Sequence, residues 1–83
     1  MATQKPTAHV RIGNIEAAIW KNETEGGTRY NVTFKRHYKD GDAWKSTDSF
    51  RRDDLLVLAK VADTAHTTIL ELQREEGDAS DDV

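Results

Sequence analysis

Residues 28–50 read TRYNVTFKRHYKDGDAWKSTDSF, and this stretch decides the fold class. In its first half, the apolar residues Tyr30, Val32 and Phe34 alternate with polar ones, which is the period of a half-buried β-strand. The Asp-Gly pair that follows predicts a hairpin turn. Residues 43–50 then predict a returning strand. The stretch therefore predicts a β-hairpin with an apolar side and a polar side.

Weaker strand signals precede this hairpin. In residues 9–21, HVRIGNIEAAIWK, the apolar positions change parity on either side of Gly13. This change predicts either a bulged bend or a tight turn between two short strands. Residues 22–27, NETEGG, predict another turn, because glycine adopts positive φ at low cost.

We expect Asp53 or a neighbouring residue to cap a helix. From there on, the apolar residues recur at spacings of three and four. The apolar stripe of the predicted helix comprises Leu55, Leu58, Ala59, Ala62, His66, Ile69 and Leu70. Four more residues widen the apolar surface beyond one stripe: Leu56, Val57, Val61 and Leu72. The excess is either exposed apolar area on a small protein or a surface for dimerisation. We expect a homodimer through Leu58, Val61, Ala62, Ala65 and Ile69.

Strands first and one long helix last predict an α+β fold with an antiparallel sheet and the helix on one face. The 83 residues leave room for one domain. We expect a flexible arm over residues 1–8, a single folded domain over residues 9–74 and an acidic, disordered tail over residues 75–83.

The net charge of −3 is unevenly distributed. Residues 75–83 hold five acids and no base, whereas residues 28–52 hold seven bases against three acids, a net charge of +4. Cysteine is absent, which excludes disulfides and thiolate metal sites. No apolar run has the roughly 18 residues of a membrane-spanning helix, and no signal-peptide core is present. We expect a soluble, cytoplasmic protein.

Nothing in the sequence predicts catalysis. A Gly-x-Ser-x-Gly motif and a cysteine nucleophile are both absent. None of His9, His37 and His66 has a second histidine at ligand spacing, so no metal site and no cofactor are expected. His66 lies within the apolar stripe and is interpreted as a partly buried helix histidine.

The polar side of the hairpin has the residue types that single-stranded nucleic acid requires. Cations follow the phosphates, and flat aromatic rings stack on the bases. The residues expected to bind nucleic acid are Arg29, Asn31, Thr33, Lys35, Tyr38, Lys45, Trp20 and Trp44. The other interpretation is an ordinary solvated sheet face, on which such residues are common.

The order of features resembles the single-stranded-DNA-binding domain of the positive cofactor four family of transcriptional coactivators. The likeness covers roughly residues 9–69: the start Val10-Arg11-Ile12-Gly13, the strand Tyr30-Asn31-Val32-Thr33-Phe34-Lys35-Arg36-His37-Tyr38, an acidic glycine turn, a Lys-Ser-Thr strand and a helix. It implies four strands and a C-terminal helix (ββββα), a homodimer paired through the helices and DNA on the outer sheet faces. Lys35 and Tyr38 match the family's basic and aromatic pair, Arg29 its basic strand start and Lys45 its basic hairpin segment, which is usually richer in lysine and arginine.

We therefore expect a non-enzymatic protein that binds single-stranded nucleic acid, DNA rather than RNA, in transcription or DNA maintenance. The expected partners are single-stranded DNA or RNA and a second copy of the chain, with no membrane. The alternative is a protein-interaction module of the same fold, which docks a protein partner and has no nucleic-acid role.

Overall fold

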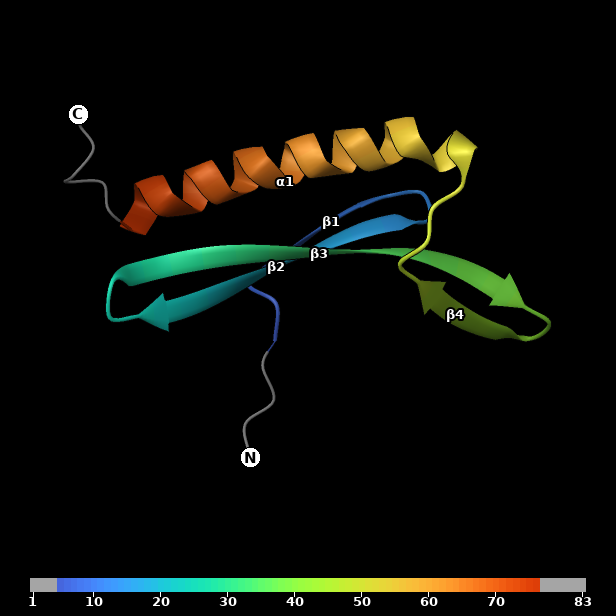
Figure 1. Cartoon of the computed structure of the whole chain (residues 1–83), viewed down its shortest axis with the longest axis horizontal. Coiled ribbons are helices and arrows are strands. Elements are labelled where there is room, and N and C mark those ends of the chain that lie inside the picture. The colour runs from blue at the N-terminus through green and yellow to red at the C-terminus, as the bar shows by residue number, and fades with distance from the viewer. Residues whose placement is uncertain (1–4, 77–83) are drawn as a thin grey trace.

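The computed structural model describes residues 5–76 and forms one antiparallel sheet covered on one face by a helix (Figure 1). The strands are β1 (Ala8–Ile12), β2 (Ile15–Thr24), β3 (Gly27–Asp40) and β4 (Ala43–Thr47), in the order β1-β2-β3-β4. A short 3₁₀ turn (Arg52–Asp54) leads into α1 (Leu55–Glu76). The predicted α+β class, with four antiparallel strands followed by one C-terminal helix, is confirmed.

The turns explain why the chain reverses where it does. Ile12 pairs directly with Ile15, so the parity change near Gly13 is the tight turn between two strands and not a bulge. Gly13 has a φ of 59°, in the left-handed region that favours glycine. Gly41, in the predicted Asp-Gly hairpin turn, has a φ of 64°. Each of these glycines allows a two-residue reversal.

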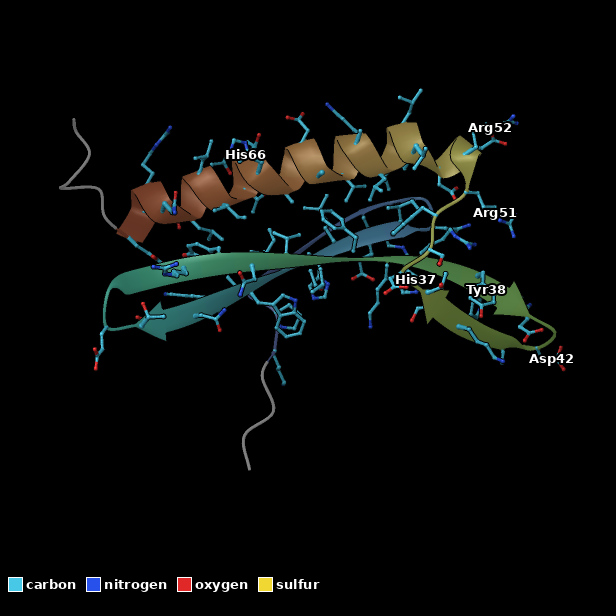
Figure 2. The ribbon with its side chains drawn as sticks, viewed as in Figure 1. His37, Tyr38, Asp42, Arg51, Arg52 and His66 are labelled. Atoms are coloured by element: carbon cyan, nitrogen blue, oxygen red, sulfur yellow. The ribbon has the colours of Figure 1, made fainter. Side chains whose placement is uncertain are left out.

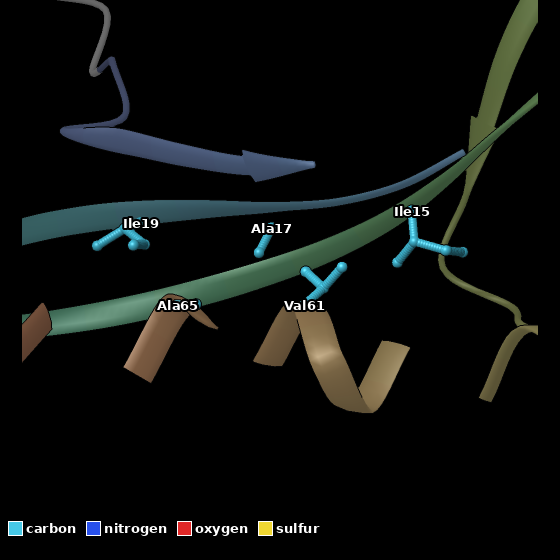
Figure 3. Packing of buried hydrophobic residues seen from close by; sticks show 5 residues of the cluster. All are labelled: Ile15, Ala17, Ile19, Val61 and Ala65. Atoms are coloured by element: carbon cyan, nitrogen blue, oxygen red, sulfur yellow. The ribbon is translucent and has the colours of Figure 1, made fainter. Parts of the chain in front are cut away.

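The core lies between β2 and α1 (Figure 3). Its fully buried members are Ile15, Ala17 and Ile19 from the sheet, and Val61 and Ala65 from the helix, all 2% exposed or less. Partly buried residues of β3, among them Val32 and Phe34, extend it. Tyr30, Val32 and Phe34 therefore face the helix, as their alternation predicts.

The rotation of α1 differs from the prediction. Val61 and Ala65 lie in the chain's own core, so their assignment to a dimer interface is wrong. Leu58 and Ile69 also pack on that core, and Ala62 is half-buried. The helix is apolar around much of its circumference, so its period alone does not select the face that meets the sheet.

Residues at the opposite side of α1 are accordingly exposed. Leu55 is 51% exposed and Leu70 is 48% exposed, although both belong to the predicted stripe. His66 is exposed as well, on the side of α1 away from the sheet, so its interpretation as a partly buried histidine is wrong (Figure 2).

Both ends of α1 are tied to the sheet by charged side chains. At the start, the Arg36 guanidinium lies 3.4 Å from the Asp54 carboxylate and donates to the Ser49 carbonyl at 3.0 Å. Asp54 is the last residue of the 3₁₀ turn, and its carboxylate also accepts the backbone N–H of Arg51, the residue just before that turn, at 3.0 Å. These contacts fix the linker between β4 and α1.

At the other end, Glu76 accepts hydrogen bonds from Lys21 at 2.8 Å and from the Tyr30 hydroxyl at 2.6 Å. Both hydrogen bonds lower the pKa of Glu76, and the one from Lys21 has the larger effect. The helix therefore continues through two residues of the predicted tail. The rest of that tail, residues 77–83, and residues 1–4 of the predicted arm lie outside the described residues.

Candidate nucleic-acid interface

The face of the sheet away from α1 carries most of the residues expected to bind nucleic acid. Strand register places Arg29, Asn31, Thr33 and Lys35 opposite Asn22, Trp20, Ala18 and Glu16, respectively, on this open face. Trp44 joins them from β4, where it pairs with Lys39. Six of the eight predicted site residues therefore share one surface: Arg29, Asn31, Thr33, Lys35, Trp20 and Trp44.

Tyr38 and Lys45 lie on the other face, so the prediction that Lys45 continues the polar face of Lys35 is wrong. Lys45 pairs with Tyr38, and both have the parity of Arg36, which faces the helix side. The two-residue turn pairs Asp40 with Ala43 and thereby fixes this register. The length of the turn is visible in the sequence and already implies that Lys45 shares the face of Tyr38.

The two faces differ in how their charges are paired. On the helix side, Lys21 contacts Glu76, Arg36 contacts Asp54, and Lys45 contacts Asp40 at 3.0 Å. On the open face, Arg29, Lys35 and Lys39 make no ion pair with any residue among 5–76. Cations without an acidic partner remain available to an anionic ligand.

Two tryptophans interrupt this basic face. The Trp20 Nε1–H donates to the Thr33 hydroxyl at 2.9 Å, which fixes the indole over the middle of the sheet. Trp44 is 64% exposed on the hairpin formed by β3 and β4. Both rings can present a flat surface to an unstacked base.

A glutamate held by two histidines lies on the same face. Glu16 contacts Nδ1 of His9 and Nε2 of His37, each at 2.6 Å. Hydrogen bonds from the two histidines lower the pKa of Glu16, and the one from His37 has the larger effect. Glu16 is the one carboxylate at the paired open-face positions of the four strands, beside the cations Arg11, Arg29, Lys35 and Lys39. Sequence reasoning missed this cluster, because its members come from three strands and show no common spacing.

A shallow pocket of about 260 Å³ opens beside this cluster. Ala18 lies between Glu16 and Trp20 along β2, and its small side chain leaves the hollow. Trp20, Thr33, Lys35 and His37 are among the residues that line the pocket. The pocket therefore combines an aromatic wall, a carboxylate and a cation.

Within residues 5–76, no group of three or more His, Cys, Asp or Glu side chains is arranged to hold a metal ion. In the same range, no helix combines the length and the apolar character needed to cross a membrane. The absence of catalysis and the cytoplasmic location stay predictions.

No protein-family model, curated protein or solved structure that was compared with the chain matches it.

Proposed function

We propose that the open face of the sheet binds single-stranded nucleic acid without a chemical step. The observation that carries this proposal is a set of open-face cations that make no ion pair with residues 5–76, interleaved with Trp20 and Trp44 on one surface. Arg29, Lys35 and Lys39 contact phosphates, and the two indoles stack on bases. A stacked aromatic contributes about 1–3 kcal/mol per base. The resemblance to the positive cofactor four family supports DNA over RNA and a role in transcription.

A fluorescence titration tests the proposal. A labelled single-stranded oligonucleotide is expected to quench tryptophan emission, and its affinity should fall as salt rises. Three phosphate contacts predict a slope of about −2 in log affinity against log salt for a single strand. An affinity that does not respond to salt, or no binding at 50 mM salt, contradicts the proposal and favours the alternative of a protein-interaction module.

Two matched variants locate the surface. Lys35→Glu and Lys45→Glu change the net charge equally, but their positions lie on opposite faces of the sheet. We expect Lys35→Glu to weaken binding about tenfold and to reduce the salt slope by about 0.7. Lys45→Glu should leave the affinity within about twofold, since Lys45 is paired with Asp40 on the other face. Equal losses in both variants would mean that binding is not confined to the open face.

The exposed side of α1 supports a second proposal, a homodimer through that side. Leu55, Ala59, Ala62, His66 and Leu70 follow one another at spacings of three and four and include no acid and no Lys or Arg. The small alanines allow a second helix to approach closely, and the family resemblance implies a dimer of this kind. Leu70→Asp is expected to convert a dimer to a monomer in light scattering. A wild-type monomer at 100 μM would contradict the proposal.

A further inference from the structure

The pocket beside Glu16 has polar chemistry that base stacking and phosphate contacts do not use. Its volume of about 260 Å³ lies just below the range of about 300–1,000 Å³ that is typical of small-molecule sites. A single planar base fits a hollow of this size better than a larger ligand. The Trp20 indole, already fixed by Thr33, forms one wall before any ligand arrives.

The two histidines determine which hydrogen bonds the pocket can still make. An ionised carboxylate accepts hydrogen bonds and cannot donate them, so His9 Nδ1 and His37 Nε2 must carry the hydrogens that face Glu16. A carboxylate has about four acceptor sites, and the histidines occupy two of them. The cluster therefore presents unused acceptors to a ligand.

Lys35 is the cation among the residues that line this pocket. It supplies donors beside the acceptors of Glu16. The most suitable ligand consequently offers donors on one part of its edge and an acceptor next to them. Among the common bases, guanine has this arrangement on its Watson–Crick edge: N1–H and the N2 amino group are donors, and O6 is an acceptor. Thymine and uracil place one N–H between two carbonyls, which suits the acceptors poorly.

We propose that this pocket receives one base of the bound strand and prefers guanine, with N1–H and the N2 amino group directed at Glu16 and O6 directed at Lys35. The ring stacks on Trp20 above Ala18. The inference rests on the proposed binding of single-stranded nucleic acid and adds a base preference to it. The rest of the open face contacts phosphates and stacks on bases without regard to sequence.

The test compares oligonucleotides that differ in one base. Fluorescence anisotropy is measured with a labelled twelve-residue thymidine strand and with strands in which a central residue is replaced by deoxyguanosine or deoxyinosine. We expect the guanine strand to bind about tenfold more tightly than the thymidine strand, within the range of a bidentate base contact. Inosine lacks the N2 amino group, so its strand should lie between the two.

Glu16→Gln and Glu23→Gln form a matched pair of variants on β2. Each removes one negative charge, but Glu16 lies on the open face and Glu23 has the parity of the helix-side residues. Glu16→Gln is expected to reduce the ratio of guanine to thymidine affinity to about one. Glu23→Gln should keep the wild-type ratio. The inosine comparison uses the wild-type protein, so it tests the contact to the N2 amino group even where Glu16→Gln fails to fold, and equal affinity of the inosine and guanine strands would overturn that contact.

The outcomes separate this inference from the proposed function. If the wild-type protein binds all three strands with equal affinity, the guanine preference is overturned and the proposed function stands. A guanine preference that survives in Glu16→Gln would place base recognition elsewhere and overturn the inference. If no strand binds at 50 mM salt, the proposed function fails and the preference fails with it.

Discussion

The two faces of the sheet use charged residues in opposite ways. On the face that meets α1, Arg36 and Lys21 hold the two ends of the helix through Asp54 and Glu76. On the open face, Lys35 and Arg29 belong to the same sheet and make no ion pair among residues 5–76. Adjacent residues of one strand point to opposite faces. Lys35 and Arg36 are therefore neighbours in the chain, but Arg36 contacts Asp54 near the start of the helix, whereas Lys35 makes no ion pair among residues 5–76.

This difference indicates which substitutions should affect folding and which should affect binding. A cation that is tied to an acid and to a backbone carbonyl contributes to stability when both contacts are partly shielded from water. A solvated cation without a partner contributes little to stability, so its replacement should leave the fold intact. Substitutions on either face can therefore test this difference.

The largest effect is expected in the core of the covered face. Ile19→Ala should lower the free energy of unfolding by about 2–5 kcal/mol, because Ile19 is fully buried and its truncation leaves a cavity. Urea denaturation followed by circular dichroism measures this loss. Leu56→Ala is the control: Leu56 is 85% exposed, and its change should stay within about 0.5 kcal/mol. Similar losses in both variants would contradict the assignment of the core.

Two arginines of β3 allow a direct comparison of the faces. Arg36→Gln should cost about 1–2 kcal/mol, since it removes the contacts to Asp54 and to the Ser49 carbonyl. Arg29→Gln, the same change on the open face, should leave the urea midpoint nearly unchanged and weaken oligonucleotide binding several-fold. The proposed division of stability and binding between the two faces would be contradicted if Arg29→Gln unfolded the protein, or if Arg36→Gln weakened binding more than Arg29→Gln does.

The hairpin shows how far the sequence defines this arrangement. Tyr30, Val32 and Phe34 alternate strictly with polar residues, so period 2 alone predicted β3 and its inward side. Lys45 was predicted on the polar side with Lys35, whereas the strand register places it on the opposite face. Trp44 is a large apolar residue that faces solvent, whereas the two-residue turn dictates that Lys45 shares the parity of Tyr38.

The helix and the Glu16 cluster show where the sequence is not sufficient. The apolar period of α1 placed His66 in the inward stripe and Val61 outside it, and only packing on the sheet shows that Val61 is buried and His66 exposed. His9, Glu16 and His37 come from three strands. Turn lengths place them on one face, but contact between them also depends on the rotamers that packing selects.

The pH dependence of stability tests the Glu16 cluster at smaller amplitude. The pKa of Glu16 is lowered in the folded protein, mainly by the hydrogen bond with His37, so the unfolded chain binds its proton more readily. This stabilisation is present above the ordinary glutamate range of about pH 4–5 and is lost as the pH falls through the lowered pKa. The same sign holds for Glu76, whose pKa is lowered chiefly by Lys21.

Glu16→Gln should therefore flatten the decline in stability below about pH 5, by about 1 kcal/mol or less for a partly exposed group. Urea midpoints measured between pH 3 and pH 7 report the change. Glu23→Gln serves again as the control and should retain the wild-type slope. If the urea midpoints of both variants fall between pH 5 and pH 3 as steeply as those of the wild type, the contacts of Glu16 with His9 and His37 do not stabilise the fold.

The smallest expected effect concerns the acids beyond α1. Residues 77–83, GDASDDV, hold three acids and no base, and we propose that they compete with nucleic acid for the cations of the open face. Deletion should begin at Gly77, because Glu76 holds Lys21 and Tyr30. We expect affinity to rise about two- to threefold at 50 mM salt and the gain to vanish at 0.5 M, where screening is strong. Replacing Asp78, Asp81 and Asp82 with asparagine keeps the length and should reproduce the gain if charge is the cause. An unchanged affinity in both variants would leave the tail no role at the open face, and its acids would then act only on solubility.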